Sequence, residues 1–228
     1  MSAEDQKDPV AALSAFVRVS YSDLVTVVVV SVLTALAALP VVTLGGAIIA
    51  GVDTLTTVIR AEGRTEAPST ERARLVYFSE SFRGNLVRGI PLGLLLVGVS
   101  VATTAYAIIA LSTGSTAFLL GAVAGLYATV LAMLWVYRTA SIIVREGDTP
   151  GPLESLRIAW YDLTDELAWT SLQAINAAAL LLVLLWTRVG LVLLLPGLLT
   201  VLEVVAFEER SGHGARSLVR GYRGELHG

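Results

Sequence analysis

Long apolar runs alternate with short charged segments along the whole chain. No charged residue occurs between Arg88 and Arg138, and the stretches from Asp23 to Asp53 and from Glu166 to Arg188 are equally free of charge. Because a helix needs about 20 apolar residues to cross a bilayer, the first of these runs holds two spans. The polar segment LSTGST at 111–116 marks the turn between them. The pattern predicts an all-α, polytopic transmembrane helix bundle.

Six spans account for these runs, and we expect them to form three helical hairpins. They are placed at Tyr21–Leu39, Val41–Arg60, Gly89–Leu111, Ser115–Val144, Ala168–Thr187 and Val189–Glu208. The second span is rich in small residues and threonine and contains Asp53, so an interfacial helix at this position, giving five spans, is the alternative. Small residues suit a helix that packs inside a bundle, which favours six.

Composition supports a membrane protein. The mean hydropathy is +0.73 and 55% of the residues are hydrophobic, which is well above the level of soluble domains. The chain has no cysteine, so disulfides and thiolate chemistry are excluded. The net charge of −3 gives no reason to expect a nucleic acid as a partner. The acidic start MSAEDQKDP lacks the features of a signal peptide.

A threefold repeat organises the charged segments. Each of Gly63, Gly147 and Gly212 follows an apolar run, and each precedes a polar linker and an arginine that opens an aromatic-bearing helix. Within a single membrane domain, 1–228, we therefore expect hairpin units at 8–63, 69–147 and 152–212 and a cytoplasmic tail at 213–228. Each unit would be an amphipathic helix followed by a transmembrane hairpin.

The linkers carry helix-start signals. Thr149 or Gly151 can cap a helix that begins with Pro152, and Ser69 or Thr70 can cap one that begins with Glu71. Arginine and aromatic residues then recur one turn apart, a spacing that suits membrane-interface anchoring. The expected anchors are Arg74, Tyr77, Phe78, Arg157, Trp160 and Tyr161. The alternative, which does not exclude the first, is that these helices pack beneath the bundle as a cytoplasmic cap.

Arginines set the expected orientation. They concentrate in the linkers and the C-terminal tail, whereas the opposite loops hold one, Arg188. Because basic residues are retained on the cytoplasmic side, we expect a multipass protein of the cell membrane with both termini in the cytoplasm.

Three ionisable residues fall inside predicted spans at matching positions of the repeat: Asp53, Arg138 and Glu203. Isolated charges in a membrane are costly, so each should face the interior and find a partner. We expect Arg138 to bridge the two acids. One interpretation is a structural ion network. A second is a polar pathway lined also by Thr54, Tyr137 and Thr139, and a third is that one of the charges snorkels to the interface.

Signatures of catalysis or of metal binding are missing from the sequence. The two histidines lie in the tail, and no GxSxG, HExxH or P-loop occurs. The glycines in TLGGA (43–47) and LLGAVAG (119–125) lie in apolar runs, which favours helix packing over phosphate binding. We expect no enzyme, no cofactor and no metal.

The chain resembles the YesL-like family of small multipass membrane proteins, a family without an assigned function. The segments that carry the resemblance are LTALAALPVVTLGGAIIAGVDTL (33–55), YFSESFRGNLVRG (77–89) and VREG (144–147), and it extends from about Ala12 to Glu208. Gly46 departs from the family, which often has proline there, and this affects how the first hairpin bends. Members are often encoded beside carbohydrate uptake transporters, and the family has no established catalytic residue.

This resemblance implies an accessory role near sugar import. We therefore expect an accessory or assembly partner of a solute transporter, with the lipid bilayer and transporter subunits as partners. A small transporter with the three charges on its pathway is the alternative, and a membrane enzyme is the least supported class.

Overall fold

The computed structural model describes residues 9–61, 70–145, 151–187, 190 and 193–210. Within these ranges the regular elements are all helical, as predicted. They are α1 (Pro9–Ser22), α2 (Leu24–Ala37), the short 3₁₀ helix η2 (Val41–Thr43), α3 (Leu44–Ala61), α4 (Glu71–Thr113), α5 (Thr116–Arg145), α6 (Pro152–Asp165), α7 (Leu167–Thr187) and α9 (Leu195–Arg210).

Four helical segments are long and apolar enough to cross a membrane: Val41–Arg60, Glu71–Thr113, Thr116–Arg145 and Leu167–Thr187. The pair α1–α2 would make a fifth if the two helices, which meet at a bend of 84°, are counted as one span. The first predicted span corresponds to α2, which has 14 residues, and the sixth corresponds to α9, which has 16. The structure therefore supports a membrane protein with four or five long apolar helices, and the count of six stays a prediction.

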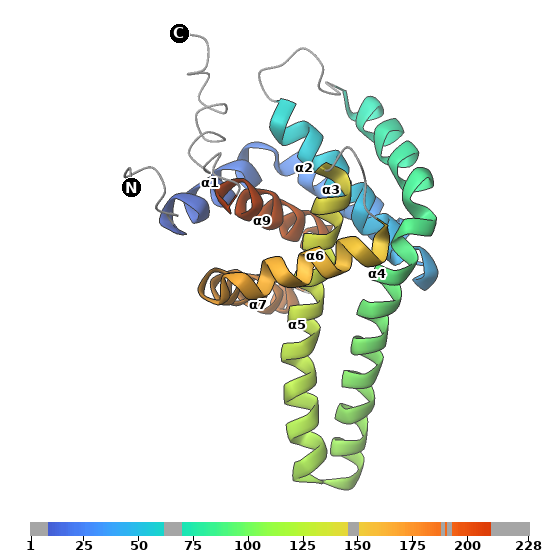
Figure 1. The fold of residues 1–228 in the computed structure, drawn as a ribbon, viewed down its shortest axis with the longest axis vertical. Helices are drawn as coiled ribbons and strands as arrows, with labels where there is room; N and C mark the ends of the chain where they lie inside the picture. Colours follow the sequence, from blue (N-terminus) through green and yellow to red (C-terminus); the bar gives the residue numbers. More distant parts are fainter. Residues whose placement is uncertain (1–8, 62–69, 146–150, 188–189, 191–192, 211–228) are drawn as a thin grey trace.

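The α4–α5 pair extends well beyond the other helices (Figure 1). Gly114 ends α4 with φ 67°, a left-handed conformation that glycine adopts without strain, and its N–H donates to Ala110 O at 2.9 Å. The predicted turn at 111–116 is thus confirmed. Along this hairpin large apolar side chains such as Leu111, Leu120 and Tyr127 are exposed, as expected for surfaces that face lipid.

Helix α3 is the most enclosed of the four apolar segments. In the apolar stretch of Val41–Arg60, 72% of the residues are buried inside the protein, whereas in the apolar stretch of α4 only 6% are buried. The core forms where α3, α5 and α9 pack on one another and on α2. The span for which an interfacial helix was the alternative is therefore an enclosed helix of the bundle, and its small residues allow this close packing.

Glycines bring α3 and the middle of α4 into backbone contact. A Cβ placed on Gly45 would lie 1.9 Å from Gly89 O, and one on Gly89 would lie 2.0 Å from Gly46 N. No side chain fits between the two helices at this crossing. This confirms the interpretation of TLGGA as a packing motif.

The predicted amphipathic helix before the second hairpin is not a separate element. Residues 74–86 belong to α4, which continues through Pro91 to Thr113 as one helix of 43 residues. The expected break near Gly89 is absent, and the helix accommodates Pro91 in its interior. By contrast, α6 and α7 are separated at Glu166, whose backbone leaves the helical region with φ −127° and ψ 70°.

The predicted helix starts are confirmed. Thr70 caps α4, its hydroxyl accepting from Ala73 N at 3.2 Å, and Glu71 lies in the first turn. Gly151 precedes α6, and Pro152 occupies its first turn. The glycines that mark the repeat, at 63, 147 and 212, lie outside the described residues.

Candidate functional site

Each of the three central helices carries a charged residue and, seven positions later, an arginine in its last turn. The pairs are Asp53 and Arg60 on α3, Arg138 and Arg145 on α5, and Glu203 and Arg210 on α9. Seven residues are close to two helical turns, so both members of a pair lie on the same face of their helix. This second arginine position is a further feature of the repeat and is visible in the sequence as a spacing of seven residues.

Arg138 is the centre of a buried ion network. Its side chain is fully buried, and its Nε lies 2.6 Å from Oε1 of Glu203, which is 1% exposed. Gln173 of α7 connects to both, since its Nε2 donates to Glu203 Oε2 at 2.7 Å and its Oε1 accepts from Arg138 Nη2 at 3.4 Å. The predicted pairing of Arg138 with Glu203 is therefore confirmed.

A residue outside the predicted spans completes this network. Asp162 of α6 accepts from Arg138 Nη1 through Oδ2 at 2.6 Å, and its Oδ1 lies 2.9 Å from Arg210 Nη2. One carboxylate thus connects α5, α6 and α9. Sequence reasoning missed Asp162 because it looked for partners of Arg138 only among the intramembrane acids.

The predicted bridge from Arg138 to Asp53 is wrong. Asp53 accepts instead from two hydroxyls of α4, Tyr77 at 3.0 Å and Ser81 at 2.6 Å. The Tyr77 hydroxyl also lies 3.1 Å from that of Thr57. The reason is the close α3–α4 crossing, which turns this face of α3 towards α4.

A second charged cluster lies at the C-terminal ends of the central helices. Oε1 of Glu208 is 2.7 Å from Arg60 Nη2 and 2.8 Å from Arg145 Nη1. The guanidinium of Arg145 also lies over the ring of Phe207, 4.0 Å from its centroid. Arginines in a last turn complement the negative end of the helix dipole, so this cluster stabilises the shared end of α3, α5 and α9.

The hydroxyls expected along a polar pathway bond elsewhere. Thr54 donates to Ala50 O at 2.8 Å and Thr139 donates to Trp135 O at 2.8 Å, each within its own helix. The third, that of buried Tyr137, donates to Pro196 O at 3.4 Å. These bonds leave the three hydroxyls directed at backbone carbonyls and not along a shared channel.

The predicted interface anchors divide into two groups. On α4, Phe78 is buried and stacked on Phe82, Tyr77 bonds to Asp53, and Arg74 donates to Thr26. Phe78 is buried and therefore does not reach a membrane interface, whereas Arg74 and Tyr77 are only half-buried, and for these two residues the anchoring role stays a prediction.

The anchors on α6 remain exposed. Trp160 is 41% exposed and Tyr161 59%, and the guanidinium of Arg157 lies 5.6 Å from the centroid of the Tyr161 ring. The helix is fixed to the bundle by its other side. There Trp135 Nε1 donates to Leu156 O at 2.8 Å. Trp160 lies at the border of the two sides, since it is partly exposed and its ring is also 5.0 Å from that of Trp135.

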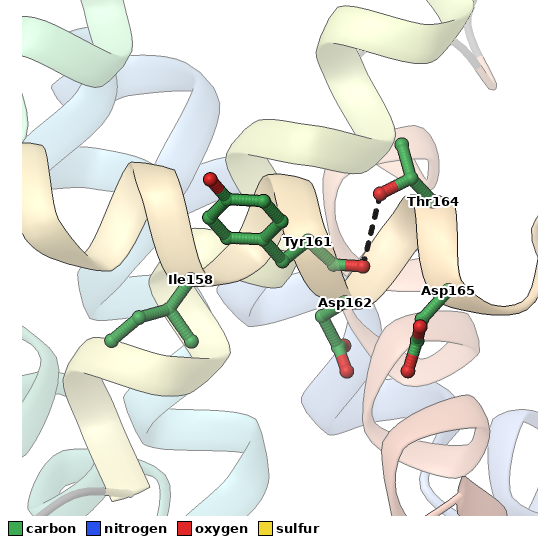
Figure 2. Close-up of a pocket in the computed structure, with 5 residues that line it drawn as sticks. All are labelled: Ile158, Tyr161, Asp162, Thr164 and Asp165. Carbon is green, nitrogen blue, oxygen red and sulfur yellow. Dashed lines mark hydrogen bonds between the residues drawn. The ribbon is translucent and has the colours of Figure 1, made fainter.

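A shallow open pocket of about 380 Å³ lies on α6 beside the ion network. Figure 2 shows its lining residues, Ile158, Tyr161, Asp162, Thr164 and Asp165. The Thr164 hydroxyl donates to Tyr161 O at 3.1 Å, and both oxygens of Asp162 are paired with arginines. Among the described residues no group of three or more His, Cys, Asp or Glu side chains could hold a metal ion.

Fold and site together define an all-helical membrane protein with a buried ion network at the junction of four helices. Comparison with known proteins adds no relative: no family model, no curated protein and no solved structure matches the chain.

Proposed function

We propose that this protein is a membrane-embedded accessory or assembly partner of a solute transporter, and that its charged centre has a structural role. The observation that carries the proposal is that the charged groups of this centre are buried and already paired with one another. Arg138 is fully buried and Glu203 is 1% exposed; the two form an ion pair, Arg138 also pairs with Asp162, and Glu203 accepts a hydrogen bond from Gln173. A solute-binding site needs polar groups that are free to meet a ligand, and these groups are already used.

The class of partner comes from the YesL-like resemblance. Members of that family are often encoded beside carbohydrate uptake transporters, so a carbohydrate transporter is the first class to test. We further propose six spans in three hairpins with both termini in the cytoplasm, since the arginines gather in the linkers and the tail.

The exposed side of α6 is the proposed contact surface. It presents Arg157, Trp160 and Tyr161 from a helix that is held firmly on its other side by Trp135 and Asp162. Aromatic residues and arginine are the side chains most enriched at protein interfaces, and a rigid support lowers the entropy lost on binding.

A small transporter is the second candidate, supported by the surroundings of Asp53. This carboxylate is half-buried, its hydrogen-bond partners are neutral hydroxyls, and Thr57 and Tyr77 beside it line an open groove of about 490 Å³. A transport pathway would therefore pass Asp53 and not Arg138.

Affinity purification of the tagged full-length chain from native membranes tests the proposal. We expect transporter subunits to co-purify, and we expect Tyr161→Ala to reduce their recovery several-fold. Tyr127→Ala is the matched control, because Tyr127 is a tyrosine that is also exposed, 74% against 59% for Tyr161, and lies on the distant α4–α5 hairpin. The accessory role is refuted if no transporter subunit is enriched over an unrelated tagged membrane protein.

Reconstituted vesicles separate the two candidates. An accessory protein alone gives no solute uptake, whereas a transporter takes up solute alone and loses this activity with Asp53→Asn. Orientation is tested with single cysteines at Ser2 and Lys7, which a membrane-impermeant reagent should leave unlabelled in intact cells.

A further inference from the structure

Helix α1 has two apolar faces, and within the part of the chain that the structure describes only one of them is covered. Ala15, Phe16 and Val19 are buried in the core. The opposite side exposes four large side chains at helical spacing: Val10 (74% exposed), Leu13 (48%), Val17 (58%) and Tyr21 (81%). We call these four residues the α1 stripe. Within a helix of 14 residues this is a large uncovered apolar surface, and such surfaces mark contact sites.

Polar residues border the α1 stripe along one side. Ser14, Arg18 and Ser22 follow one another at intervals of four residues, and together with the stripe they line an open groove of about 810 Å³. An apolar band edged by an arginine, with a tyrosine at one end, is the pattern of helices that lie in the boundary between headgroups and acyl chains.

The angle between α1 and α2 fits this arrangement. The two helices meet at 84°, so α1 runs almost parallel to the membrane plane when α2 points into the bilayer. The backbone stays hydrogen-bonded through the bend, with Asp23 N donating to Val19 O at 3.0 Å and Val27 N donating to Asp23 O at 2.8 Å. The angle is therefore built into the chain.

The exposed apolar surface continues from α1 onto α2. Leu24 is 46% exposed and Val25 is 64% exposed, and α2 itself has no charged residue. Ser22 and Asp23 lie at the bend between the two exposed apolar surfaces. An exposed apolar face that adjoins an exposed apolar face on the next helix meets the same surroundings, namely lipid.

We propose that α1 is an interfacial helix that seats the α1 stripe in the membrane surface, with Arg18 directed at lipid phosphates. The occupant of the groove is the lipid boundary, and neither a second copy of the chain nor another protein covers it. This inference does not depend on the proposed partner, because it concerns only how the chain contacts lipid.

Site-directed spin labelling of the full-length protein in lipid nanodiscs tests the proposal. Since the chain has no cysteine, Leu13→Cys and Val17→Cys each give one labelled site without further changes. Power saturation compares collisions of the label with oxygen, which is enriched in lipid, and with a water-soluble nickel chelate. We expect both stripe labels to be more accessible to oxygen, giving a positive depth parameter. Ser22→Cys, which is exposed at the polar border, is the matched control and should give a negative one.

Two results would overturn the proposal. Stripe labels that collide mainly with the nickel chelate would place α1 in water. Stripe labels shielded from both reagents would show that protein covers the stripe, either a second copy or another part of the chain. Replacing Arg18 by glutamine should also remove any difference in label depth between nanodiscs with and without phosphatidylglycerol, if the guanidinium binds phosphate.

Discussion

Removing Glu203 should destabilise the protein through the charge that it leaves behind on Arg138. In the Glu203→Leu variant, Arg138 Nε loses the carboxylate 2.6 Å away, and Gln173 Nε2 loses its acceptor at 2.7 Å. Arg138 is fully buried, and among the described residues it keeps Asp162 as its one anionic partner. Breaking a buried ion pair from one side costs about 3–5 kcal/mol.

Glu203→Gln should cost less, about 1–3 kcal/mol. The amide oxygen can still accept from Arg138, so the variant loses the charge but keeps an acceptor. The order of stability should be wild type, then Glu203→Gln, then Glu203→Leu. Unfolding in mixed micelles, followed by circular dichroism against the fraction of denaturing detergent, measures these differences.

The double variant Arg138→Met with Glu203→Leu decides whether the pair itself is responsible. Replacing both partners by apolar residues of similar size removes the uncompensated charge, and such replacements are often neutral or stabilising. We expect the double variant to recover most of the loss seen in Glu203→Leu. If the two single effects simply add, Arg138 and Glu203 are not coupled, and the description of the charged centre as one network is wrong.

Three further outcomes are expected from the same unfolding assay. Gly89→Ala should destabilise the bundle by about 1–3 kcal/mol by overpacking, because its Cβ would lie 2.0 Å from the backbone of α3. Gly98→Ala is the control and should be neutral, because its Cβ would meet nothing within 4 Å. Equal effects of the two variants would refute the close crossing. The charge swap Asp53→Arg with Arg138→Asp should recover no stability over the single changes, because the two residues have separate partners. Recovered stability would instead support the ion pair between Asp53 and Arg138 that the sequence predicted. Glu208→Gln should cost about 1–3 kcal/mol by leaving two arginines without their shared carboxylate, and high salt should not reproduce this loss, because one of the arginines is largely buried.

The sequence alone determined the class of protein and most of its local structure. Apolar runs longer than a bilayer span identify membrane segments. These segments are helical because unpaired backbone groups cannot remain in hydrocarbon. The cap at Thr70, the start of α6 at Pro152 and the turn at Gly114 follow from the chemistry of single residues, and all three are confirmed. Burial of Arg138 and Glu203 was predictable for the same reason, since a charge inside an apolar helix must find a partner.

Only the tertiary structure decided which partners meet. The repeat places Asp53, Arg138 and Glu203 at one position of three hairpins, but equivalence in sequence gives no information on how the helices rotate or cross. The contact between Gly45 and Gly89 brings α3 against α4, so that Asp53 accepts a hydrogen bond from Tyr77. The packing of α6 on the bundle brings Asp162 within hydrogen-bond distance of Arg138. Ion pairs form between side chains that are close in space, and that proximity is set by the packing of backbones far apart in the chain.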